Sequence, residues 1–207
     1  MSYISVVLTV ASIHLLALMS PGPDFVLITR NSLLYSKRSG VYTALGLACG
    51  IALHVTYSLI GIGLIIAKSV ILFSILKFFG AAYLMFIGYK SLCSKPSAEQ
   101  REMTAGEAHL DTRKALRMGF FTNATNPKAT LFFLSVFTLV INPATPLFVK
   151  LIMGAEMIAA TFLWFSFVSL LVSHRAVKNR VGRFQHYTEK ATGFVLIALG
   201  LKLSVSK

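Results

Sequence analysis

Two charged side chains stand inside long apolar stretches, and each comes directly after a proline. Asp24 follows Pro21-Gly22-Pro23 in the first half of the chain, and Lys128 follows Asn126-Pro127 in the second half. A charge in lipid is costly unless protein or water satisfies it. Opposite charges at matching breaks in two apolar segments therefore predict a polar site inside a membrane protein.

The prolines predict where the helices break. Proline lacks a backbone N–H and clashes with the preceding turn, so Pro23 and Pro127 should interrupt the first and fourth apolar segments. Proline also suits the first position of a new helix, which would place Asp24 in the first turn. The unpaired N–H groups at such a helix start can bind an anion. The alternative is a kink that serves packing alone.

The two charges could bracket one small ligand. A free amino acid at neutral pH carries both an ammonium and a carboxylate group. Asp24 could hold the ammonium, while Lys128 and a helix N-terminus hold the carboxylate. Gly22, Pro23, Asn126 and Pro127 would shape the breaks around it. The alternative is a structural ion pair between the two halves, and the two roles are compatible.

Three other ionisable residues lie in apolar segments and rank behind this pair. His54 could take part in proton movement, because histidine titrates near physiological pH. A hydrogen-bonded packing role is favoured for His54, and more strongly for His14. Glu156 is expected either to face a cavity or to reach toward the membrane interface.

Composition indicates an integral membrane protein. Of the 207 residues, 56% are hydrophobic and only 13% are charged, whereas about a quarter are charged in soluble domains. The net charge of +13 comes from lysines and arginines, which gather in short loops as orientation signals do. Nucleic-acid binding is therefore not expected. No metal-binding, nucleotide-binding or hydrolase motif is present in the sequence, so neither a cofactor nor a metal is predicted.

Six transmembrane helices are predicted in one transmembrane domain over residues 1–207. The helices should cover residues 3–29, 41–67, 70–92, 116–141, 147–173 and 187–205. A polar loop over about 94–113 separates the two halves. The loops after the first, third and fifth segments are the most basic, which predicts that they are cytoplasmic and that both termini are periplasmic.

The halves resemble each other. Lys77-x-x-Gly80 and Gly88-Tyr89-Lys90 in the third segment match Lys190-x-x-Gly193 and Gly200-Leu201-Lys202 in the sixth. Three spans is an odd number, so a second unit must be inserted upside down relative to the first. The prediction is two inverted three-helix repeats, 1–93 and 114–207, with helices 1 and 4 broken at proline.

These motifs resemble the LysE/RhtB family of amino-acid exporters. The likeness rests on the run from Ala17 to Phe25, the small residues Gly46 to Gly50, the Lys77-to-Lys90 pattern and Asn126-Pro127-Lys128. The first segment is most similar to the branch that exports threonine, homoserine and homoserine lactone. The resemblance implies an inner-membrane, proton-driven exporter of small neutral amino acids, and members are often regarded as dimers.

Two other classes of function remain open at this point. One is an intramembrane enzyme that uses Asp24, His14 and His54. Asp24 and His14 are about 15 Å apart along a continuous helix, so they would share one site only if the break folded them together. The other is a passive channel or scaffold. A carrier without a nucleotide site would have to use an ion gradient, most simply one of protons.

Overall fold

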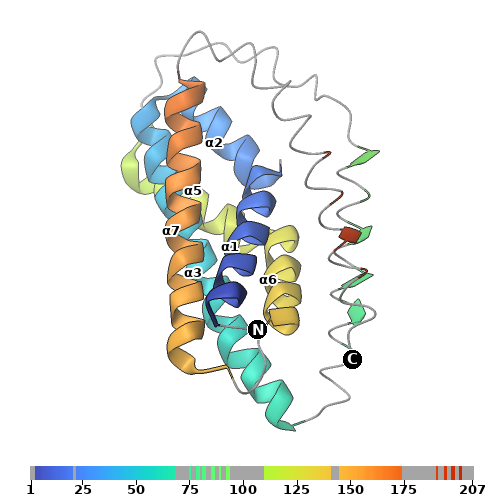
Figure 1. Cartoon of the computed structure of the whole chain (residues 1–207). Helices are drawn as coiled ribbons and strands as arrows, with labels where there is room; N and C mark the ends of the chain where they lie inside the picture. The colour runs from blue at the N-terminus through green and yellow to red at the C-terminus, as the bar shows by residue number, and fades with distance from the viewer. Residues whose placement is uncertain are drawn as a thin grey trace.

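The described part of the protein is built from helices (Figure 1). A computed structural model describes residues 3–20, 22–68, 110–140 and 145–173, with isolated positions between 75 and 93 and between 190 and 201. Six helices have their bounds in these ranges: α1 (Tyr3–Met19), α2 (Pro23–Leu34), α3 (Lys37–Lys68), α5 (Thr112–Ala124), α6 (Pro127–Val140) and α7 (Leu147–Val172). The prediction of an all-helical protein is confirmed over these residues.

The first apolar segment is broken where its prolines predict. Helix α1 ends at Met19 and α2 begins at Pro23, with a bend of 57° between them. Gly22 precedes α2 in an extended conformation, and the ring of Pro23 fixes the backbone angle that a helix start needs. Helix α2 continues to Leu34, beyond the predicted end of this segment at residue 29.

The second break follows the same local chemistry. Helix α5 ends at Ala124 and α6 begins at Pro127. The side-chain Oδ1 of Asn126 accepts a hydrogen bond of 3.0 Å from the backbone N–H of Lys128. This bond satisfies one of the N–H groups that the first turn of α6 leaves without a helical partner. The predicted break at Pro127 is therefore present.

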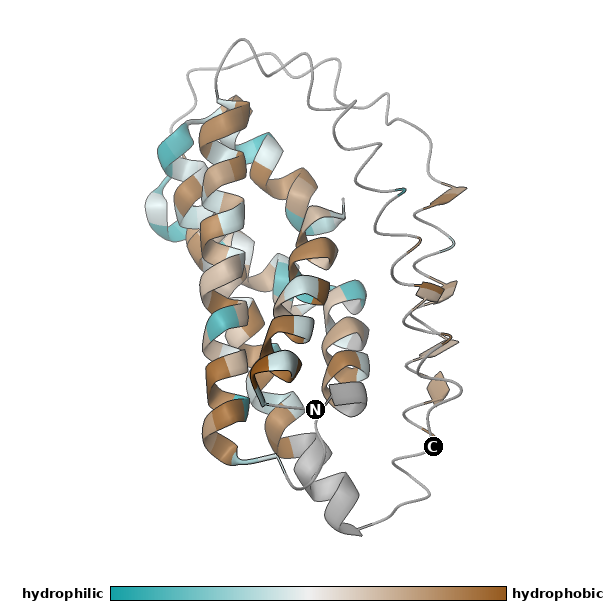
Figure 2. Ribbon diagram, in the orientation of Figure 1, coloured by the Kyte–Doolittle hydropathy of each residue, from teal (hydrophilic) through white to brown (hydrophobic). Residues whose placement is uncertain are grey.

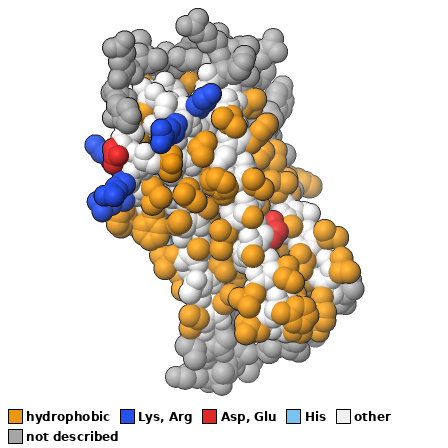
Figure 3. All heavy atoms as spheres, turned by 90° about the vertical axis from the view of Figure 1, so that its left-hand side faces the viewer, with side chains coloured by type: hydrophobic (Ala, Val, Ile, Leu, Met, Phe, Trp, Pro, Cys, Tyr) orange, Lys and Arg blue, Asp and Glu red, His pale blue; other side chains and the backbone are white. Residues whose placement is uncertain are grey.

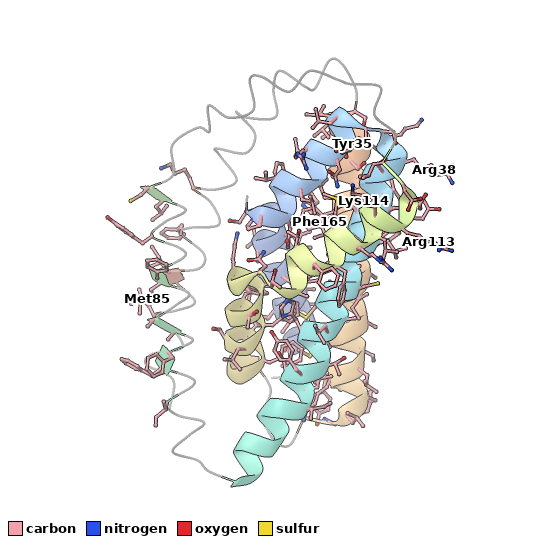
Figure 4. All side chains as sticks on the ribbon, turned by 180° about the vertical axis from the view of Figure 1, so that it is seen from behind. Tyr35, Arg38, Met85, Arg113, Lys114 and Phe165 are labelled. Atoms are coloured by element: carbon pink, nitrogen blue, oxygen red, sulfur yellow. The ribbon has the colours of Figure 1, made fainter. Side chains whose placement is uncertain are left out.

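Helices α3 and α5 cross at close range because glycines line the crossing. An ideal Cβ atom placed on Gly46 would lie 2.1 Å from the carbonyl oxygen of Leu116, and one on Gly119 would lie 2.2 Å from that of Thr43. Figure 4 shows α5 running obliquely across α3. The small-residue pattern at Gly46–Gly50 predicted a close helix contact, and this is where it occurs.

Helix α7 runs beside α3 along its length and encloses the core with it (Figure 1). One apolar cluster joins α1, α3, α6 and α7, and another joins α1, α2, α3 and α7. The most buried large members of the two clusters are Val10, Phe133, Phe137, Met153, Met157, Ile28 and Leu47. The broken helices α1–α2 and α5–α6 are thus held against two long, continuous helices.

The outer surface matches a lipid environment. Two described helices are long and apolar enough to cross a membrane, α3 over Lys37–Ile60 and α7 over Leu147–Val172, and the bent pair α1–α2 gives a third if it forms one span. Apolar residues cover most of the helices in Figure 2. In Figure 3 the lysine and arginine side chains gather toward one end of a largely hydrophobic face.

Several predictions concern stretches that the structure leaves wholly or largely undescribed. They are the third and sixth segments with Lys77 and their repeated glycines, most of the 94–113 loop, the basic loop after the fifth segment and both ends of the chain. These lie outside the described residues, so the six-helix inverted repeat stays a prediction.

Candidate functional site

Residues from both helix breaks line one cavity in the interior. The cavity has about 450 Å³ of space not filled by atoms, including its open mouth. Its polar lining comes from His14, Ser20, Gly22, Asp24, Asn123, Asn126 and Lys128. Its apolar lining comes from Ala17, Leu18, Phe25, Ile51, Ala129, Phe132, Phe133 and Phe165. Phe165, which is labelled in Figure 4, lies on α7 and forms part of this apolar lining.

Asp24 reaches from the first break to the second. It lies in the first turn of α2, where the helix dipole favours a negative charge. Asn123 Nδ2 donates a hydrogen bond of 2.7 Å to Asp24 Oδ2, and Asn126 Nδ2 donates one of 3.3 Å to Asp24 Oδ1. Each carboxylate oxygen is thus hydrogen-bonded by a neutral amide.

Lys128 makes the reciprocal connection. Its Nζ donates to the hydroxyl of Ser20 at 2.8 Å and to the backbone carbonyl of Ser20 at 3.3 Å. Gly22 lies against the same side chain, since a Cβ atom there would be 3.6 Å from both Lys128 Cδ and Nζ. The aspartate of one break and the lysine of the other are therefore tied across the molecule, and both line the cavity.

His54 lies behind the cavity wall and is not among its lining residues. Its ring is buried and stacks on Phe133, with centroids 5.5 Å apart. Its Nε2 is 2.9 Å from the backbone carbonyl oxygen of Asn123, and its Nδ1 is hydrogen-bonded to the hydroxyl of Tyr57. His54 therefore supports the end of α5, from which Asn123 reaches Asp24.

Glu156 lies on α7 and does not line this cavity either. Its side chain is partly buried, and Oε2 has no hydrogen-bond partner among the described residues. Pro23 and Pro127 are the first residues of α2 and α6 and act through the backbone there. The structure thus brings Gly22, Asp24, Asn126 and Lys128 together at the cavity.

Three polar cavity residues were not among the predicted substrate-binding residues: Ser20, Asn123 and His14. Asn123 is one turn before Asn126, and this spacing was the available signal that both amides could meet one carboxylate. Asp24 and His14 both line the cavity, one on each side of the break between α1 and α2.

The described residues contain no cluster suited to a metal ion. Among them, no group of three or more histidine, cysteine, aspartate or glutamate side chains converges. The cavity instead offers one carboxylate, one ammonium and several neutral hydrogen-bonding groups. This set is suited to binding a small charged molecule.

Broken apolar helices around a charged cavity define a class of protein, the helical membrane transporters. A family model described as "LysE type translocator" matches residues 15–207. The chain belongs to this family, and the resemblance drawn from its helix breaks is confirmed. Its members are transporters, so the protein is a transporter and not an enzyme.

Curated relatives cover nearly the whole chain. The chain is 30% identical over 193 residues to an uncharacterized membrane protein, YrhP, of Bacillus subtilis, covering 90% of this chain and 92% of that protein. It is 29% identical over 202 residues to the threonine efflux protein of Salmonella typhi, covering 96% of this chain and 97% of that protein. The threonine efflux protein of Escherichia coli K12 is 29% identical over 201 residues, covering 97% of this chain and 98% of that protein. No solved structure matches the chain.

Proposed function

We propose that the protein exports small amino acids or close derivatives, of the threonine, homoserine and homoserine lactone type, across the bacterial inner membrane. One observation carries this proposal: two opposite charges, one from each helix break, line a single interior cavity. A zwitterion has the complementary pair of charges. The threonine efflux relatives support the choice of amino acids and the outward direction.

Asp24 holds the substrate ammonium in this proposal. An ammonium group has three donors and needs acceptors, and Asp24 presents two carboxylate oxygens whose protein partners are neutral amides. A charge-assisted hydrogen bond is roughly twice as strong as a neutral one. The amides of Asn123 and Asn126 keep the carboxylate oriented when the ligand is absent.

Lys128 holds the substrate carboxylate. Its ammonium is bonded to the hydroxyl and carbonyl of Ser20, which are neutral groups that a carboxylate can replace. Lys128 also lies in the first turn of α6, where the dipole of the helix favours an anion. Gly22 lies beside this side chain, at a distance that would put a Cβ atom in ordinary van der Waals contact with it.

The wider mechanism is part of the same proposal. Six transmembrane helices in two inverted repeats would expose the site alternately to the two sides, with protons as the coupling ion and a homodimer as the assembly. Exposed basic residues next to the ends of α2, α3 and α5 support a cytoplasmic position for that end of the molecule. They are Arg30, Lys37, Arg38, Arg113, Lys114 and Arg117. Both termini would then be periplasmic.

Two assays test the function directly. Cells that lack their own exporters and are fed threonine-containing dipeptides should accumulate less intracellular threonine when they express this protein. Purified protein in proteoliposomes should exchange labelled for unlabelled threonine with saturation kinetics. Flux that rises linearly with concentration and shows no counterflow would identify a channel and reject the carrier.

The contact of Gly50 with Asn123 gives a prediction for the site. A Cβ atom on Gly50 would lie 2.6 Å from Asn123 Oδ1 and 2.7 Å from its Cβ. Gly50→Ala should therefore push Asn123 away from Asp24 and lower kcat/KM for export about tenfold, as expected for loss of one hydrogen bond to a charged group.

A matched control is available on α7. A Cβ atom on Gly154 would meet only the side chain of Val55, at 2.7 Å and away from the cavity. Gly154→Ala should therefore keep kcat/KM within about twofold of the original, because it leaves every cavity contact in place. Equal losses in the two variants would show that Gly50 acts through general packing.

A further inference from the structure

His14 is a buried polar side chain without a hydrogen-bond partner in the part of the chain that the structure describes. Its exposed fraction is 1%, and neither Nδ1 nor Nε2 has a hydrogen-bond partner among the described residues. Its ring contacts are aromatic, with Phe132 at 6.1 Å and Phe133 at 5.9 Å between centroids. Buried polar groups in native proteins are nearly always hydrogen-bonded, so this exception asks for an explanation.

The position of His14 offers an explanation for its missing partners. The residue lines the same cavity as Asp24 and Lys128. It lies on α1 ahead of Ser20, to which Lys128 is bonded. The six-residue step from His14 to Ser20 spans about 9 Å along a helix. A small ligand, together with the reach of two side chains, can bridge that length. Apart from His14, this part of the lining includes apolar side chains of Ile51, Phe132 and Phe133.

We propose that His14 is a specificity-determining residue whose ring hydrogen-bonds with a hydroxyl group on the substrate side chain. The site then favours small hydroxyl-bearing amino acids over apolar ones of the same shape. The inference rests on the proposed function and adds to it the residue that reads the substrate side chain. A neutral imidazole has one donor and one acceptor, and a hydroxyl can serve either.

The other buried histidine shows what a packing role looks like in this protein. Both ring nitrogens of His54 have partners, the carbonyl of Asn123 and the hydroxyl of Tyr57. His14 has none among the described residues, and it lines the cavity. Removing an unpartnered polar group from an apolar setting does not cost stability. A structural role and a recognition role therefore predict different outcomes for the same substitution.

The test compares threonine with valine, which has a methyl group in place of the hydroxyl. The full chain, purified and reconstituted in proteoliposomes, is assayed for kcat/KM with each labelled amino acid. The original protein should favour threonine at least tenfold, because a site built to bind a hydroxyl rejects the analogue without one. His14→Leu should bring the ratio near one by lowering threonine transport, while His14→Gln, which keeps a donor and an acceptor, should retain most of the preference.

Two controls keep the test decisive. Ile13→Leu changes a buried neighbour on α1 that does not line the cavity, so it should leave the threonine-to-valine ratio unchanged. His14→Leu should melt at or above the temperature of the original protein. A lower melting temperature together with an unchanged ratio would assign His14 to packing.

The outcomes separate this inference from the proposed function. If the original protein transports neither amino acid nor any other, the proposed function fails and the inference fails with it. If it transports amino acids but does not prefer threonine, or if the ratio in His14→Leu is unchanged, only the inference is overturned. Should His14→Leu not fold, His14→Phe serves in its place, and a preserved threonine preference in that variant overturns the inference.

Discussion

Asp24→Asn is expected to lower export at least a hundredfold. The substitution keeps the shape of the side chain and removes its charge, so the substrate ammonium loses its charged acceptor. A hundredfold loss corresponds to about 2.7 kcal/mol, within the range of roughly 1.5–3 kcal/mol for a hydrogen bond to a charged group. The amides of Asn123 and Asn126 each donate a hydrogen bond to Asp24. The carboxamide introduced by the substitution would have only one acceptor oxygen for these two donors.

The loss should come from the site and not from unfolding. Asp111→Asn is the matched control, because Asp111 is an exposed aspartate before α5 with no side-chain capping bond. It should export within about twofold of the original protein, since exposed substitutions of this kind have small effects. Asp24→Asn should elute as a folded protein with an unchanged melting profile. Export by that variant at the original rate would contradict the proposed site.

Gly46→Val should have the largest effect on folding. A Cβ atom at Gly46 would lie 2.1 Å from the carbonyl oxygen of Leu116 and 2.8 Å from the backbone nitrogen of Phe120. Backbone atoms cannot rotate away, so α3 and α5 would have to separate along their contact. Overpacking of this kind costs about 1–3 kcal/mol and sometimes more, and we expect a clear fall in melting temperature and in yield.

The glycines of the chain provide graded controls for this prediction. Gly46→Ala should destabilise less than Gly46→Val but more than Gly154→Ala, which meets only the side chain of Val55. Gly22→Ala should fold normally, because its nearest foreign atoms are 3.6 Å away. Melting temperatures in one detergent decide the order. If Gly46→Val melted like the original protein, the close crossing of α3 and α5 would be wrong.

The helix breaks could be predicted from the sequence because their cause is local. Proline acts on its own backbone and on the preceding turn, so Pro23 and Pro127 mark the starts of α2 and α6 without any knowledge of the tertiary fold. The bounds of α7 and the end of α3 followed from apolar length in the same way, but α3 begins at Lys37, four residues before its predicted start at 41, because its first turn is polar and basic. The extension of α2 to Leu34 did not, because that stretch contains Arg30 and polar residues that resemble a loop.

The partners of the two charges could not be predicted, because they are set by how distant elements meet. Asp24 and Asn123 are separated by 99 residues, and Lys128 and Ser20 by 108. The spacing of Asn123 and Asn126 indicates that both amides could meet one carboxylate, but only the helix crossing shows that this carboxylate is Asp24, and Ser20 has no such signal. His14 shows the same limit, since an isolated histidine on an apolar helix looks like a core residue until its empty hydrogen-bonding positions are found beside a cavity.

The most direct measurement compares how two truncated ligands compete with labelled threonine in proteoliposomes. Threonine amide keeps the ammonium but lacks the carboxylate, and 3-hydroxybutyrate keeps the carboxylate but lacks the ammonium. Inhibition constants are obtained for the original protein, Asp24→Asn and Lys128→Met. The original protein should bind threonine at least tenfold more tightly than either analogue.

The account predicts a crossed pattern in the variants. Asp24→Asn should bind 3-hydroxybutyrate as well as threonine, and Lys128→Met should bind threonine amide as well as threonine. Variants that bind threonine weakly but keep the original preference over both analogues would show that neither residue contacts the charge assigned to it.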